Sequence, residues 1–244
     1  MFVDCTFFIV FIIVACYTIL KKEGVPMNPI IIACKTIEQE LLAAMEQTNC
    51  NYPILWLESG LHNWPDKLHA RIQELLDGCG DFDTVLLAMS FCGNSVVGLK
   101  NRDFQLVIPR SDDCITLLLG SPQRRREAKA TYFLTEGWLK GELNLWKEYQ
   151  NCLAKYGEKR GKRIFSALLA HYKKLALVDT GCFDREALEE QVRQIAAVLG
   201  LEYICLDGTL DHLNQLLTGP WTEERFVQVE PHSIVTTEMC TLKG

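Results

Sequence analysis

The chain has 244 residues, of which 48% are hydrophobic and 23% charged, and its formal net charge is −6. A chain of this length and composition can bury a sizeable core, which excludes extended disorder over most of its length. The negative charge argues against a general nucleic-acid-binding protein, because such proteins use a basic surface to displace counterions from phosphates.

The N-terminal region contains a long apolar segment. Residues 5–20 are mainly apolar and are followed by Lys21 and Lys22, which brings the segment close to the lower limit for a membrane span. Asp4 precedes the run, whereas a signal peptide would have a basic residue there and a cleavage site afterwards. The segment is therefore either a membrane anchor or an extension from an upstream start codon. We favour the second interpretation, in which residues 1–26 are a leader and the folded protein begins at Met27.

From Met27 onward, short apolar runs alternate with amphipathic segments. This alternation predicts an α/β fold, in which strands and helices alternate around a mostly parallel sheet. Residues 35–47 and 65–78 have the apolar spacing of helices, and the continuously apolar strands predict helices on both faces of the sheet. The predicted strands cover residues 29–34, 52–59, 84–90, 104–109, 131–135, 175–181 and 201–207.

A long helical stretch separates the fifth and sixth predicted strands. Residues 137–174 exceed an ordinary crossover connection, and we interpret them as a helical insertion between a first α/β half, 27–136, and a second, 175–244. Residues 121–174 carry 13 Lys and Arg against 5 Asp and Glu, a local charge of about +8. We expect this basic surface to be solvated, including the run of Arg124, Arg125 and Arg126. The alternative is that it attracts an anionic ligand or a protein partner.

The chain has eleven cysteines, which is many for its length. They show neither the dense spacing of a disulfide framework nor the Cys-x-x-Cys pair of zinc ribbons and thioredoxin-like sites. We therefore expect a reducing, cytoplasmic environment in which most cysteines are packing residues and a few are functional.

Three cysteines occupy equivalent positions at strand ends. Cys34 ends the first predicted strand, Cys92 follows the third, and Cys114 follows the fourth. Ligands of open α/β sheets bind outside the carboxyl ends of the strands, where helix N-termini also stabilise thiolates. Any one of these cysteines alone is explained as well by packing, but their shared position predicts a site. Cys182, after the sixth strand, is a candidate fourth member.

Three thiolates with one open coordination position would bind zinc or an iron–sulfur cluster. The same edge carries polar residues, some of which also have structural interpretations: His62 as a turn residue, and Arg110 with Asp113 as an ion pair. The residues that we expect to contact a cofactor or small-molecule ligand are Lys35, Thr36, His62, Gly93, Asn94, Arg110, Asp113 and Thr116.

Several stretches resemble one protein family, the bacterial and archaeal domain of unknown function 1638. The resemblance covers residues 29–235, and within it the family pattern matches at Cys34, His62, Cys92, Gly93, Asn94, Asp113 and Cys114. Lys35 stands where the pattern has glycine. The stretches that carry the resemblance are "IIACKTIEQEL", "LESGLHNWPDKL", "FCGNSVVGL", "IPRSDDCITLLLGS", "TYFLTEGWL" and "GPWTEERFVQVEPHSIV".

The resemblance implies a context in one-carbon metabolism, because members of this family often occur beside corrinoid-dependent methyltransferases. A corrinoid protein or a methyltransferase is accordingly an expected partner. Two alternatives to a metal-binding function stay open: a metal-free enzyme with Cys92 or Cys114 as nucleophile, and a non-catalytic accessory protein. The chain lacks the glycine-rich nucleotide motifs, the His-Glu-x-x-His motif and the esterase elbow, so the sequence leaves catalysis itself undecided.

Overall fold

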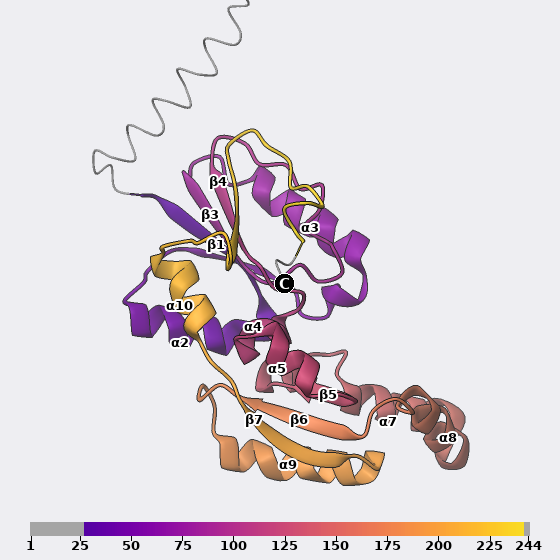
Figure 1. Ribbon diagram of the computed structural model, residues 1–244. Coiled ribbons are helices and arrows are strands. Elements are labelled where there is room, and N and C mark those ends of the chain that lie inside the picture. The colour runs from indigo at the N-terminus through magenta and orange to yellow at the C-terminus, as the bar shows by residue number, and fades with distance from the viewer. Residues whose placement is uncertain (1–26, 242–244) are drawn as a thin grey trace, which may run out of the picture.

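The computed structural model describes residues 27–241 and shows two lobes (Figure 1). The first lobe is built on a five-stranded sheet with the order β2-β1-β3-β4-β8, and the second on a three-stranded sheet with the order β5-β6-β7. All strand pairs are parallel except β4 with β8. The strands are β1 (Pro29–Cys34), β2 (Ile54–Leu57), β3 (Thr84–Ala88), β4 (Gln105–Pro109), β5 (Thr131–Leu134), β6 (Lys174–Asp179), β7 (Glu202–Asp207) and β8 (Phe226–Val229).

Helices cover both faces of the first sheet, as the apolar strands predict. In β1, Ile31 and Ala33 pack with α2, α4 and α10, whereas Ile30 and Ile32 pack with α3 on the other face. This alternation follows from the twofold period of a strand. The helices are η1 (Lys35–Ile37), α2 (Glu38–Thr48), η2 (Leu61–Asn63), α3 (Pro65–Asp77), α4 (Cys114–Leu119), α5 (Pro122–Glu127), α6 (Glu136–Lys140), α7 (Leu145–Tyr156), α8 (Glu158–Leu168), α9 (Arg185–Leu199) and α10 (Asp211–Thr218).

The second lobe has its own core but shares part of the core of the first. On one face, residues of α7, α8 and α9, such as Tyr149, Phe165 and Val192, pack against the sheet. On the other face, Phe133 and Val178 belong to the cluster that also contains residues of β1, β3 and α4. The hydrophobic interior is therefore continuous between the lobes.

The seven predicted strands correspond to β1–β7, but they form two sheets. β4 does not pair with β5, because β8 lies antiparallel along β4, with Leu106 opposite Val229. We did not predict β8, a four-residue strand close to the C-terminus. With that edge of the first sheet taken, β5 pairs with β6 and begins the second sheet.

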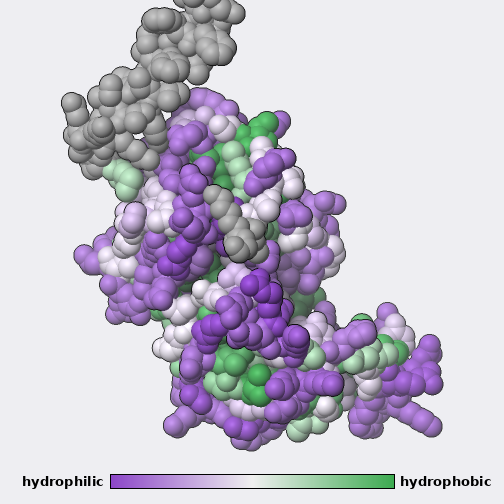
Figure 2. Space-filling view, viewed as in Figure 1, coloured by the Kyte–Doolittle hydropathy of each residue, from purple (hydrophilic) through white to green (hydrophobic). Residues whose placement is uncertain are grey.

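The helical stretch between β5 and β6 supplies α6, α7 and α8. In Figure 1, α7 and α8 lie together beside one end of the second sheet, whereas α9 runs along its outer face. The surface in the same view is mainly hydrophilic, but hydrophobic side chains gather over the edge strand β7 beside α5 (Figure 2). Across residues 27–241, no helix combines the length and the apolar character that a membrane crossing requires. Residues 5–20 lie outside the described residues. Met27, the proposed start, is the first residue that the structure describes.

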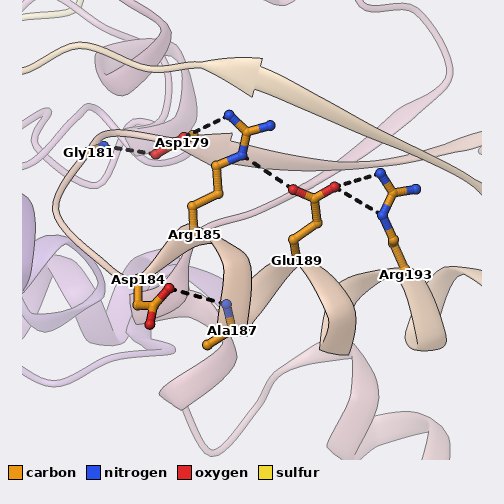
Figure 3. A network of polar contacts seen from close by, with 7 residues as sticks. All are labelled: Asp179, Gly181, Asp184, Arg185, Ala187, Glu189 and Arg193. Atoms are coloured by element: carbon orange, nitrogen blue, oxygen red, sulfur yellow. Dashed lines mark hydrogen bonds and ion pairs between the residues drawn. The ribbon is translucent and has the colours of Figure 1, made fainter.

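The end of β6 is fixed by a polar network that leads into α9 (Figure 3). Asp179 accepts a hydrogen bond from the backbone of Gly181 at 2.9 Å and forms an ion pair with Arg185 at 3.6 Å. Asp184 caps α9 by accepting from the Ala187 backbone at 3.2 Å. These contacts fix the loop that carries Thr180 and Cys182.

A buried carboxyl group joins the lobes beside this loop. Glu40 of α2 has no exposed surface, and its Oε1 accepts a hydrogen bond from the Thr180 hydroxyl at 3.1 Å. Its other oxygen meets no hydrogen-bond donor in the described part of the chain. Burial raises the pKa of Glu40, against the opposing effects of hydrogen bonds from its own backbone and from Thr180.

Glu40→Gln is expected to remove a pH-dependent loss of stability. The pKa of Glu40 is raised above its ordinary value of 4.5, so above that pH the folded state holds a proton that the unfolded chain has lost. The free energy of unfolding therefore falls as pH rises from 4.5 through the raised pKa. Urea unfolding across this range should show the variant gaining stability relative to the wild type as pH increases.

The matched control for this experiment is Glu46→Gln, which removes an exposed carboxyl group from the same helix. Its stability difference from the wild type should stay nearly constant over the same pH range. Parallel curves for Glu40→Gln and the wild type would contradict the raised pKa of Glu40.

Candidate functional site

A cavity of about 440 Å³ lies between the lobes at the carboxyl edge of the first sheet. One wall is formed by segments that follow β1, β2, β3 and β4, and the other by α5, β5, α6 and the chain just before β6. The volume lies within the range of roughly 300–1,000 Å³ that is common for small-molecule sites. The position is the one where open α/β sheets bind their ligands.

The thiols of Cys34, Cys92 and Cys114 all line this cavity. Cys34 is the last residue of β1, and Cys114 is the first residue of α4. Cys92 lies in the loop after β3 with a left-handed backbone conformation, φ 43°. Strand ends of a parallel sheet meet at one edge, and this brings together three cysteines that are far apart in the sequence.

The surroundings of two of the thiols raise their pKa values. A hydrogen bond with Cys92 and burial together raise the pKa of Cys114 well above its ordinary value. Burial raises the pKa of Cys34 to about 11, with a smaller contribution from the nearby Cys114 and an opposing one from Thr36, whose hydroxyl lies 3.3 Å from Cys34 Sγ. Cys34 and Cys114 are therefore protonated at neutral pH. A bound metal cation would have to displace those protons.

Four of the other predicted ligand-contacting residues line the cavity: Thr36, His62, Gly93 and Asp113. The imidazole of His62 lies against Trp138, with ring centroids 4.7 Å apart. Burial lowers the pKa of His62, which favours the neutral form that can bind a metal or accept a proton. Asp113 caps α4, because its Oδ1 accepts from the Thr116 backbone at 2.6 Å.

The remaining four predicted residues lie elsewhere. Lys35 is exposed and lines a different cavity between α2 and α6, and Asn94 is an exposed turn residue. Thr116 is buried among the residues of α4 and does not line the cavity. Arg110 donates to the carbonyls of Glu223, Met239 and Thr241 and so fixes the C-terminal segment.

Cys182, the candidate fourth thiol, is also outside the cavity. It lies after β6 at the edge of the second sheet, where its Sγ is 3.5 Å from the carbonyl oxygen of Thr180. Because β6 belongs to the second sheet, Cys182 does not reach the cavity of the other three cysteines, although it too follows a strand.

The second lobe contributes residues that sequence reasoning missed. The guanidinium of Arg125 lies 4.2 Å from the centroid of the Phe133 ring, and its Nε is 3.7 Å from Asp113. That Nε is buried and has no hydrogen-bond acceptor within residues 27–241. Arg125 is thus only partly solvated: 37% of its side chain is exposed, but its Nε is buried because β5 and α5 fold against the first lobe. Tyr132, Trp138 and Tyr172 complete this aromatic wall.

No three Cys, His, Asp or Glu side chains between residues 27 and 241 surround a common point as a ready metal site. The cavity thus has the chemistry of a soft-metal site, with three thiols and a neutral imidazole, but its sulfurs would have to move closer to bind one ion.

One protein family matches the chain. The model of the family described as "Protein of unknown function (DUF1638)" covers residues 56–217, which include Cys92, Cys114 and the aromatic wall. Neither the curated proteins nor the solved structures contain a significant match to the chain.

Proposed function

The chain belongs to the DUF1638 family, whose activity is unknown, and we propose that it binds a soft metal centre, zinc or an iron–sulfur cluster, through Cys34, Cys92 and Cys114. The observation that supports this proposal is that three strand ends present their thiols to one cavity between the lobes. Thiolates are the ligands that these metals prefer.

The donor set fits such a centre in chemistry and in number. Three thiolates leave one coordination position open, which is the arrangement of catalytic rather than structural sites. Cys34, Cys92 and Cys114 would hold either kind of centre. Bound metal would supply Lewis acidity or electron transfer, and the His62 imidazole would offer a proton acceptor beside it.

The same proposal assigns Arg125 to ligand binding. Its guanidinium lies on the Phe133 ring beside Asp113 at the cavity wall, and part of the Arg125 side chain stays exposed there. An arginine held in this way suits a carboxylate or phosphate group. The ligand would thus be a small anionic or cofactor molecule bound between the aromatic wall and the thiols.

The biological setting is part of this proposal. We propose that the protein acts in the cytoplasm, in one-carbon or corrinoid-linked metabolism, with a corrinoid protein or a methyltransferase as partner. If it is an accessory protein, Arg126 is the suitable basic residue to test, because it is exposed and lies outside the cavity. Arg124 is unsuitable, since it donates to the carbonyls of Leu119 and Asp207.

Anaerobic purification, followed by metal analysis and an absorption spectrum, tests the metal proposal. We expect close to one zinc ion or one coloured cluster per chain, and a metal-free protein should regain it from Zn²⁺ or from iron and sulfide. A colourless protein that binds neither under these conditions would refute the proposal.

A second candidate function is a metal-free enzyme with Cys92 as the nucleophile. It is favoured by the left-handed backbone of Cys92 and by the neighbouring Cys114 thiol, which can donate a hydrogen bond to a Cys92 thiolate. In that case iodoacetamide would alkylate Cys92 selectively in protein that contains no metal. Alkylation spread over all cavity cysteines would argue against a specialised nucleophile.

A further inference from the structure

The loops that follow β3 and β4 are joined by backbone hydrogen bonds. The N–H of Phe91 donates to the carbonyl of Ser111 at 2.9 Å, and the N–H of Cys92 donates to the carbonyl of Asp112 at 3.0 Å. The two loops therefore run side by side beyond the ends of their strands. Their relative position is fixed by main-chain contacts, independently of any ligand in the cavity.

This pairing places one cysteine of each loop at the same cavity. The backbone of Cys92, whose N–H pairs with Asp112, turns here with a positive φ of 43°, and the nearby Cys92 side chain is the first cause of the raised pKa of Cys114. Left-handed backbone is uncommon for a residue other than glycine, and such strain is concentrated at functional sites. Both thiols line the cavity, and Cys92 is only half-buried, so a small reagent can reach them.

Cys34 is held differently, although it lines the same cavity. Its sulfur is 3.3 Å from the hydroxyl of Thr36, and it ends β1 rather than lying in one of the paired loops. Among the three cavity cysteines, Cys92 and Cys114 are thus the two that lie in, or directly after, the loops joined by backbone hydrogen bonds.

From this arrangement we infer that Cys92 and Cys114 are a redox modification site, a dithiol that small disulfide molecules convert reversibly to an intramolecular disulfide. The inference goes beyond the proposed metal binding, because it needs only the two paired loops. Oxidation would remove two of the three thiols from the cavity and so prevent it from binding metal.

The reaction balances with one molecule of a low-molecular-weight disulfide such as oxidised glutathione. The Cys92 thiolate attacks one glutathione sulfur, the glutathione S–S bond breaks, and one glutathione thiolate leaves and takes up a proton. The Cys114 thiol then loses its proton to water and attacks the Cys92 sulfur, which expels the second glutathione. Two protein thiols are oxidised, and one disulfide molecule is reduced to two thiols.

The test is to treat the reduced, metal-free, full-length protein with oxidised glutathione, block the remaining thiols with N-ethylmaleimide and map the digested peptides by mass spectrometry. We expect a peptide pair joined through Cys92 and Cys114, with Cys34 carrying the alkyl group. Reduction by dithiothreitol before alkylation should leave all three cysteines alkylated.

Two variants make the test specific. Cys34→Ser should leave the Cys92–Cys114 link unchanged, whereas Cys114→Ser should accumulate a mixed disulfide of glutathione on Cys92. Circular dichroism checks that each variant is folded. A persistent glutathione adduct on Cys92 of the wild-type protein, or a link through Cys34 instead, would overturn the inference.

The outcome is separable from that of the metal experiment. A protein that forms the disulfide but binds neither Zn²⁺ nor a cluster retains the redox site and loses the proposed metal function. A protein that binds metal but never forms the disulfide when metal-free would overturn the redox inference and retain the proposed metal function.

Discussion

Replacing Gly137 by alanine is expected to lower the free energy of unfolding by roughly 1–3 kcal/mol, the usual cost of overpacking a well-packed contact. A Cβ at this position would lie 2.2 Å from the carbonyl oxygen of Thr36 and 3.0 Å from its carbonyl carbon. These are backbone atoms of the short helix η1, so they cannot move aside as the end of a flexible side chain could. The second lobe therefore contacts the first here through main chain.

The substitution should also disturb the cavity. Gly137 directly precedes Trp138 and contacts Thr36. Trp138 and Thr36 both line the cavity. Pushing α6 away from η1 would separate the aromatic wall from the strand ends that carry the thiols. We therefore expect weaker ligand or metal binding in Gly137→Ala, in addition to the lower stability.

The matched control is Gly80→Ala. A Cβ at Gly80 would have no atom within 4 Å, and its backbone does not require positive φ. Urea unfolding should place this variant within about 0.5 kcal/mol of the wild type, as for an ordinary surface substitution. Equal free energies of unfolding for Gly137→Ala and Gly80→Ala would contradict the close approach of α6 to η1.

Serine substitutions of the cavity cysteines are expected to give the largest change in metal binding. If Cys34, Cys92 and Cys114 are ligands, replacing any one should weaken Zn²⁺ binding by more than about 100-fold, because loss of a mere outer-shell partner already costs roughly 10–100-fold. Serine keeps nearly the same shape but offers an oxygen, which soft metals bind less well. Competition with a chromophoric chelator measures the affinities.

Cys50→Ser and Cys205→Ser are the controls, since both cysteines are half-buried free thiols outside the cavity. Their Zn²⁺ affinity should equal that of the wild type. Equal affinity for all five variants would show that the metal binds elsewhere, and a loss confined to Cys92→Ser and Cys114→Ser would exclude Cys34 as a ligand.

Much of the secondary structure follows from the sequence because its signals are local. Residues 29–34 form β1 with the predicted bounds, and the runs around β3, β4 and β6 were found because strands buried on both faces are continuously apolar. β8 was missed because it has only four residues, one of which, Gln228, is exposed, and lies in a polar segment. Its identity as a strand depends on β4, more than a hundred residues earlier.

The candidate site was likewise predicted only in part. Cys34, Cys92 and Cys114 were predicted together, because parallel strands always place their carboxyl ends at one edge of the sheet. Arg110 and Thr116 come from the same edge but point elsewhere, toward the C-terminal segment and the core. Proximity in sequence to a strand end fixes where a residue is, whereas side-chain direction depends on packing.

The sequence by itself determined the family, the α/β alternation and the gathering of three thiols at strand ends. Only the tertiary structure decided that the strands divide between two sheets, and that Arg125 and Trp138 of the second lobe face those thiols across a cavity. The physical reason is that apolar periodicity reports whether a segment is buried. Which partner buries it is settled by long-range pairing, such as β8 against β4, and by shape-specific contacts such as Gly137 against Thr36.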